Sequence, residues 1–433
     1  MKGRNTGVFS VRAGAGPLGG LLCGMMLVAC STNGPSLTTT SALPTASAPS
    51  AEETDRKPRQ VKVALLVPAS APGHSGLIGR SLKQAAELAL FEHDNPTVQL
   101  IVKDDKGTPE GARAAAEEAV KGGAQLILGP LFAKSASAVA PVARQAGVPV
   151  VTFSTDRQVA GNGVYLLSYQ PPPEVARVID YAARRGKRRF AALVPDDAFG
   201  KLVTASFTEA VARAGGSVVA LENYPATANG VVEPLRKVSA AIQRADAQGA
   251  PVDALFIPGG QESVELIARL LPQAEIDTTK IKLIGSGGMD YPNAGRDARL
   301  VGAWYPGPDP RGFTEFAQKF AKTYAAAPPR IAVLAHEAVG LAITLSAQAD
   351  RQPFGPAQLT RAGGFSGIDG AYRLLPDGST ERALAILEVQ KFGSGVIEPA
   401  SSLSAVPSSP AGATSSVGGV LGGLLPKSIL NLN

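Results

Sequence analysis

The chain has few of the side chains that build most catalytic and metal sites. Its 433 residues include two cysteines, Cys23 and Cys30, and three histidines, His74, His93 and His336. Without a cysteine after residue 30, the rest of the chain cannot form a disulfide, bind a metal through thiolates or use a cysteine nucleophile. His336 begins a segment like the HExxH of zinc proteases, but the second histidine is missing. The sequence therefore predicts no metal site and no cofactor.

Glycine-rich motifs for phosphates and cofactors are incomplete. Residues 73–81 follow a predicted strand and open a predicted helix, but the P-loop spacing is wrong and Arg80 replaces its lysine. Backbone amides at such a helix start can still hold an anion. The segment 285–288 lacks the GxGxxG spacing, and the sequence contains no GxSxG nucleophile elbow. The acidic pairs at 104–105 and 196–197 are more typical of helix-capping turns, with cleft lining as the functional alternative. We predict that the protein is not an enzyme.

Charge and aromatic content are also low. The chain is 45% hydrophobic, 18% charged and 5% aromatic, so its core must consist mainly of Ala, Val, Leu and Ile. The net charge of +6 falls to about +3 without Lys2, Arg4 and Arg12 of the leader. So small and dispersed a charge excludes nucleic acid as an expected partner.

The first thirty residues have the pattern of a secretory signal. Three basic residues precede an uncharged segment, residues 13–29, that is too short to span a membrane comfortably. This segment ends in Leu-Val-Ala before Cys30, which resembles the lipobox of bacterial lipoproteins. The resemblance implies a signal peptide of residues 1–29 and lipidation of Cys30. The alternative is an ordinary signal peptide with an incidental cysteine.

Two low-complexity segments flank the predicted domain. The low-complexity composition of residues 30–60 predicts a disordered tether after a lipidated cysteine. The composition of residues 398–433 predicts a disordered tail. A protein attached in this way lies in the periplasm, with a lipid anchor to the membrane. Ser31, rather than aspartate, follows the cysteine. By resemblance to lipoprotein sorting, this favours the outer membrane, with the inner membrane as the alternative.

Between these segments, short apolar runs alternate with stretches of helical periodicity. Residues 63–67 are continuously apolar, as a strand buried on both faces of a parallel sheet should be. A second strand–helix series begins after the prolines at 171–173. The alternation predicts an α/β protein of two lobes, each a parallel sheet between helices, with a cleft between the carboxyl edges. Residues 371–375 and 383–388, on either side of Pro-Asp-Gly, predict a hairpin.

The order of these segments resembles the type I periplasmic binding proteins of the Leu/Ile/Val-binding group over about residues 61–388. The stretches that carry the resemblance are VALLVP from Val63, LILGP from Leu126, GVPVV from Gly147, DDAFG from Asp196, and residues 325–341. The resemblance implies a two-lobed fold in which the chain crosses three times between lobes, near residues 169–173, 304–308 and 366–370. Lobe 1 then comprises residues 61–172 and 307–366, and lobe 2 comprises residues 173–306 and 367–397.

The resemblance also implies where a ligand is held. Amino-acid binders of this family hold the carboxylate with hydroxyls after the third and fourth strands, and the ammonium with an acid in the second lobe. Ser154 and Thr155 fit the fourth-strand position. Ala133 stands where a serine is expected, with Ser135 two residues on, and Gly287 stands where the acid is expected. Asp290 is the nearest carboxylate in the sequence. The predicted cleft residues are Ser70, His74, Ser75, Pro130, Ser135, Ser154, Thr155, Phe199, Gln261 and Asp290.

Two functions fit these features. Residues 281–292 and 367–389 resemble the penicillin-binding protein activator lipoproteins, although the helical-repeat domain of the best-known members is absent. This resemblance implies a non-catalytic regulator that contacts a peptidoglycan synthase, with a small polar ligand as an option. The alternative is a solute receptor that delivers branched-chain amino acids or amides to an ABC permease.

Overall fold

The computed structural model describes residues 60–93, 97–225, 227, 229–291, 293–348 and 352–403. The predicted signal peptide, Cys30, nearly all of the tether and the tail from residue 404 lie outside these residues. In the part of the chain that is described, no helix is both long and apolar enough to cross a membrane.

The first lobe is built on a sheet of five parallel strands in the order β2-β1-β3-β4-β5. In the strand β1, Val63 and Leu65 pack in one hydrophobic core, while Ala64 and Leu66 pack in another. Both faces of the sheet are therefore buried. This explains why the sequence of β1 is a continuous apolar run. The strands are β1 (Val61–Val67), β2 (Val98–Asp104), β3 (Leu126–Leu128), β4 (Val150–Thr152) and β5 (Val164–Leu166).

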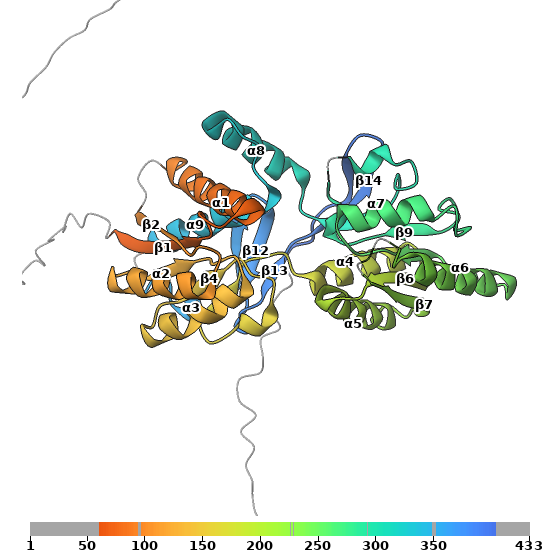
Figure 1. The fold of residues 1–433 in the computed structure, drawn as a ribbon, viewed down its shortest axis with the longest axis horizontal. Coiled ribbons are helices and arrows are strands. Elements are labelled where there is room, and N and C mark those ends of the chain that lie inside the picture. Colours follow the sequence, from red (N-terminus) through yellow and green to blue (C-terminus); the bar gives the residue numbers. More distant parts are fainter. Residues whose placement is uncertain are drawn as a thin grey trace, which may run out of the picture. The chain divides into compact units, whose positions relative to one another are not determined.

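Helices cover both faces of this first sheet. One core contains residues of α1, α8 and α9, and the other contains residues of α2 and α3. Figure 1 shows α1 on one side of the sheet and α2 and α3 on the other. The helices are α1 (Gly73–Phe91), α2 (Pro109–Lys121), α3 (Ala133–Gln145), α8 (Pro310–Tyr324), α9 (Val333–Ser346) and the short α10 (Pro356–Leu359).

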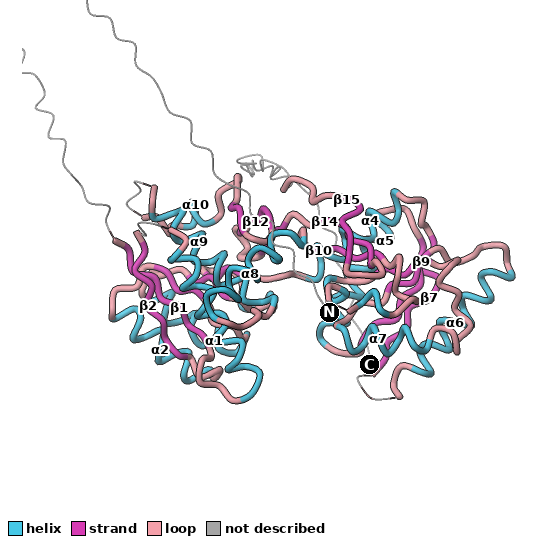
Figure 2. Tube along the Cα trace, turned by 90° about the horizontal axis from the view of Figure 1, so that it is seen from above, coloured by secondary structure: helices cyan, strands magenta, loops and turns pink. Residues whose placement is uncertain are grey.

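The second lobe is built on seven strands in the order β15-β14-β10-β9-β8-β6-β7. The strands from β10 to β7 are parallel, whereas β14 and β15 add an antiparallel edge beside β10 (Figure 2). The strands are β6 (Arg189–Pro195), β7 (Ser217–Tyr224), β8 (Ala254–Phe256), β9 (Lys282–Ile284), β10 (Trp304–Gly307), β14 (Ala385–Val389) and β15 (Ser394–Glu398). The helices are α4 (Pro171–Arg184), α5 (Ala198–Arg213), α6 (Val232–Ala247) and α7 (Gln261–Leu270).

The predicted α/β fold with two lobes and three crossings is confirmed, but the last crossing and the hairpin are corrected. Residues 370–374 do not pair with residues 385–389. Instead, a separate antiparallel sheet joins β11 (Phe365–Gly367), β12 (Gly370–Leu374) and β13 (Thr380–Arg382). Because Tyr372 and Leu374 pack in the core with α1 and α9, and β13 pairs with β12, the chain crosses after β13, and not near residues 366–370.

A buried charged cluster lies where β13 meets α9. Arg382 forms an ion pair with Glu337, and its guanidinium lies 4.9 Å and 5.1 Å from the ring centres of Tyr169 and Tyr372. Arg330 forms an ion pair of 2.9 Å with Asp369, which also accepts the Tyr169 hydroxyl. The charges of the two arginines and the two carboxylates cancel within the cluster. The cluster ties the first crossing, next to Tyr169, to the strand that leads into the last one.

We predict that Arg382→Met lowers the free energy of unfolding by about 3 kcal/mol or more, because it leaves the Glu337 carboxylate buried without its cation. Denaturant unfolding of the full chain measures this. Arg236→Met, which breaks an exposed pair with Glu233, is the matched control and is expected to leave the unfolding midpoint unchanged. Equal midpoints for Arg382→Met and the unaltered protein would contradict the structural role of the pair.

Candidate ligand-binding site

A cavity of about 590 Å³ lies at the carboxyl ends of the second-lobe strands. The loops after β6, β8 and β9 and the end of β7 form most of its wall, while Thr155 and Tyr169 come from the first lobe. Parallel strands end at one edge of their sheet, so these loops meet there although they are far apart in sequence. The remaining lining residues include Pro171, Glu174, Pro195, Asp197, Phe199, Tyr224, Pro225, Thr227, Val231, Gly259, Gly260, Glu262, Ser263, Leu266, Ser286 and Gly288.

The Glu174 carboxylate is the central polar group of this cavity. Glu174 lies in the first turn of α4, directly after the first crossing, and one of its oxygens accepts the N–H of Gly287 at 3.0 Å. Desolvation raises the pKa of this carboxyl to about 7, against the lowering effect of the Gly287 N–H. A Cβ atom on Gly287 would lie 3.1 Å from both carboxylate oxygens. Glycine at position 287 therefore gives the carboxylate room to approach the backbone.

This contact changes the interpretation of Gly287. The family resemblance predicts an acidic side chain at that position, and the sequence has none. In the structure, Glu174 brings a carboxylate to the same place from a different element, 113 residues earlier in the chain. The second lobe therefore does present an acid to the cavity, and Asp290 is not needed for that purpose.

Two other acids, two tyrosines and four serine or threonine residues make up the rest of the polar lining. Asp197 caps α5 by accepting the Gly200 N–H at 2.7 Å, and Glu262 is exposed in the first turn of α7. Burial raises the pKa of the Tyr224 hydroxyl. None of the residues that line this cavity is a lysine, arginine or histidine. Such a cavity favours a ligand group that is positively charged or donates hydrogen bonds.

The structure brings only two of the predicted cleft residues into this cavity, Thr155 and Phe199. Gln261 begins α7 but does not line the cavity, and its amide donates to Glu265 at 2.9 Å. Asp290 is exposed, does not line the cavity, and accepts the Tyr305 hydroxyl at 3.2 Å.

Other predicted residues of the first lobe serve its own loops. The Ser154 hydroxyl is buried and accepts the Asp156 N–H at 3.1 Å. Pro130 is buried after a cis peptide bond, and its carbonyl accepts the Thr152 hydroxyl at 2.7 Å. The Ser70 N–H donates to Asp104 at 3.3 Å.

The remaining predicted residues lie near the start of α1 or of α3. His74 is exposed in the first turn of α1 and does not line the cavity that contains Glu174. It also does not line the first-lobe cavity that contains Ser75 and Ser135. Ser75 and Ser135 line a separate cavity of the first lobe.

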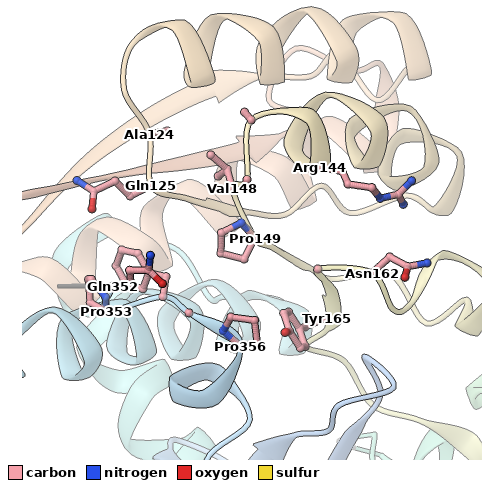
Figure 3. Close-up of a pocket in the computed structure, with 15 residues that line it drawn as sticks. Ala124, Gln125, Arg144, Val148, Pro149, Asn162, Tyr165, Gln352, Pro353 and Pro356 are labelled. Carbon is pink, nitrogen blue, oxygen red and sulfur yellow. The ribbon is translucent and has the colours of Figure 1, made fainter. Parts of the chain in front are cut away.

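A further cavity of about 510 Å³ lies at the opposite edge of the first sheet, before β3, β4 and β5. Pro149, Tyr165 and Pro356 lie around it, while Arg144 and Asn162 lie to one side (Figure 3). Ligands of open α/β sheets bind at the carboxyl ends of the strands. The cavity that contains Glu174 is therefore the better candidate.

Comparison with known proteins agrees with this fold. The sequence profile of the family described as periplasmic binding protein matches residues 60–394. A Leu/Ile/Val-binding protein homolog 6 from Brucella melitensis is 26% identical over 281 residues, which cover 60% of this chain and 69% of that protein.

Solved structures share the fold. An ABC transporter substrate-binding protein from Sphaerobacter thermophilus superposes with a TM-score of 0.61 at 19% identity, over 78% of this chain and 98% of the other. A substrate-binding protein from Desulfitobacterium hafniense, solved in complex with Leu, gives a TM-score of 0.57 at 18% identity, over 78% and 99% of the two chains. The profile match spans well over half of the sequence, and the chain belongs to the periplasmic binding protein family.

Proposed function

We propose that this protein is the solute-binding component of an ABC importer, and that it binds a small solute with an amino group in the cavity that contains Glu174. The observation that carries the proposal is the Glu174 carboxylate, placed against Gly287 in a cavity wall with three acids and no basic side chain. A carboxylate with one backbone partner can accept further hydrogen bonds from an ammonium or amide group.

The dimensions and apolar lining suit an amino acid or an amino-acid amide. A volume of about 590 Å³ lies within the range of small-molecule sites. Phe199, Val231 and Leu266, with the prolines of the wall, offer contacts for an aliphatic side chain. On the first-lobe side, the Thr155 hydroxyl is available to a carboxylate or amide oxygen.

The partner that follows from this proposal is an ABC permease. The relatives named above include substrate-binding proteins of ABC transporters, whereas none of them is a regulator of a peptidoglycan synthase. The activator interpretation gains no support from them, and the importer alternative fits better. The family implies a periplasmic location. We further propose that a lipid on Cys30 tethers the domain to a membrane.

We predict that leucine or leucinamide stabilises the full chain against thermal unfolding. A ligand present at 100 times its Kd is expected to add about 2.7 kcal/mol to the free energy of unfolding. Thermal-shift measurements over a panel of amino acids and their amides check this. No shift with any member of the panel would contradict the proposed function.

We predict that Glu174→Gln weakens binding of the best amino-bearing ligand by about tenfold or more, because a charge-assisted hydrogen bond to the ammonium is lost. Calorimetry gives the Kd values. Asp290→Asn is the matched control and is expected to leave the Kd unchanged, because Asp290 lies outside the cavity and asparagine can still accept from Tyr305. The reverse pattern would show that Asp290, and not Glu174, receives the amine.

Binding of an ammonium ligand is expected to weaken as the pH falls below about 7. The ligand requires the ionised carboxylate, whereas the raised pKa of about 7 means that Glu174 is protonated in the unliganded protein at lower pH. Kd measured from pH 5.5 to 8 should therefore decrease as the pH rises, and then level off. A flat profile for the unaltered protein, or the same slope in Glu174→Gln, would contradict the assignment.

A further inference from the structure

The chain continues beyond the part that the family profile matches. The profile ends at residue 394, at the start of β15, whereas the structure describes the chain as far as residue 403. Residues 399–402 are exposed and belong to no helix or strand, but Leu403 is half-buried. A segment with this pattern leaves one packed surface, passes through solvent and packs again. We call residues 399–403 the strap.

The first end of the strap is held by the second lobe. The guanidinium of Arg177, in α4, donates to the Pro399 carbonyl at 3.2 Å and to the Glu398 carboxylate at 2.6 Å. Arg184, further along the same helix, forms a second ion pair with Glu398 at 2.8 Å. Hydrogen bonds from Arg184 and Arg177 lower the pKa of Glu398 to about 2, so this carboxylate is ionised at neutral pH. The strap therefore starts from a point that is fixed to α4.

The second end of the strap packs against the first lobe. Leu403 lies beside Gly364, because a Cβ atom on Gly364 would be 3.0 Å from Cδ1 of Leu403. Gly364 has a φ of +60°, which favours glycine, and the missing side chain leaves room for the leucine. Phe365, the next residue, belongs to the hydrophobic core that contains residues of α1 and α9. The strap therefore ends on the first lobe.

The strap is thus a fourth connection between the lobes, in addition to the three crossings. Four peptide units join Pro399 to Leu403, so the Cα atoms of these two residues can be at most about 14 Å apart. If the lobes separate further at this side, the chain must release either the contact of Leu403 with Gly364 or the hydrogen bond from Arg177. So short a segment therefore opposes such a movement.

We propose that the strap limits how far the two lobes move apart, and so narrows the range of arrangements that the unliganded protein adopts. A ligand that binds between the lobes then removes less conformational freedom. The inference goes beyond the proposed function, because the restraint acts without a ligand. It also uses none of the residues that line the cavity with Glu174.

The test measures distances between spin labels on the two lobes, in the absence of ligand. The labels are attached at Lys121→Cys in α2 and Lys201→Cys in α5, which are exposed positions. The full chain carries Cys23→Ser and Cys30→Ser so that only the labelled positions react. Double electron–electron resonance then gives the distribution of interlobe distances, and we expect a single narrow distribution.

A longer strap should broaden this distribution. Insertion of Gly-Ser-Gly-Ser between Ser401 and Ser402 keeps both attachments and adds about 14 Å of reach. We expect at least about one molecule in ten to show a longer distance. The same insertion between Ala405 and Val406 lies beyond the second attachment, and this matched control should leave the distribution unchanged.

A point variant tests the second attachment without a change in length. Leu403→Ala loses most of the contact with Gly364 and should broaden the distribution as the first insertion does. Leu77→Ala removes the same atoms from an exposed position of α1, and should have no effect.

Two results would overturn the proposal. One is an unchanged distribution with the insertion between Ser401 and Ser402 or with Leu403→Ala. The other is an equal broadening by the insertion between Ala405 and Val406. The thermal-shift panel of amino acids tests the proposed function separately. If no amino acid binds but the longer strap broadens the distribution, the proposed function fails while this inference stands.

Discussion

The buried ion pair between Arg382 and Glu337 is the interaction on which the arrangement of the crossing segments depends. It joins β13, which leads into the last crossing, to α9 of the first lobe, and the guanidinium is enclosed between Tyr169 and Tyr372. Tyr169 lies two residues before the start of α4, the helix that carries Glu174. Because a buried charge without its partner is unfavourable, the pair fixes these segments in one arrangement. Arg382 and Glu174 also line one small cavity, so the Glu174 carboxylate lies next to this cluster.

The candidate binding site depends on an acid, Glu174, that comes from a different element than the family resemblance predicts. In this chain a glycine occupies the position where the family resemblance predicts a carboxylate, and the glutamate of another element lies against that glycine. The cavity wall therefore still has a carboxylate, but this carboxylate belongs to a helix and not to the loop after β9. Glu174 lies in a helix next to the crossing, partly removed from water, and its pKa is therefore raised to about 7. The proposed recognition of an amine would in this way be coupled to pH near neutrality.

The sequence was sufficient for the fold but not for the site. The apolar run of β1, the regular strand–helix alternation and the proline-rich first crossing predict two doubly wound lobes, because burial on both faces leaves a clear pattern. The contact between Glu174 and Gly287 spans 113 residues and leaves no pattern in sequence spacing. Ser154 has the right residue type at the right strand end, yet its hydroxyl accepts a backbone N–H of its own loop. The last crossing was misplaced because the turn at Gly370 belongs to the β11–β12 hairpin.

The central claim is that the Glu174 carboxylate receives the amino group of the solute. The most direct test measures protons released on binding, from calorimetry at pH 6.5 in buffers of different ionisation enthalpy. With a pKa of about 7, Glu174 is mostly protonated before binding and must ionise to pair with an ammonium. The account predicts release of more than about half a proton per ligand by the unaltered protein and none by Glu174→Gln. Binding without proton release, or the same release by both proteins, would contradict it.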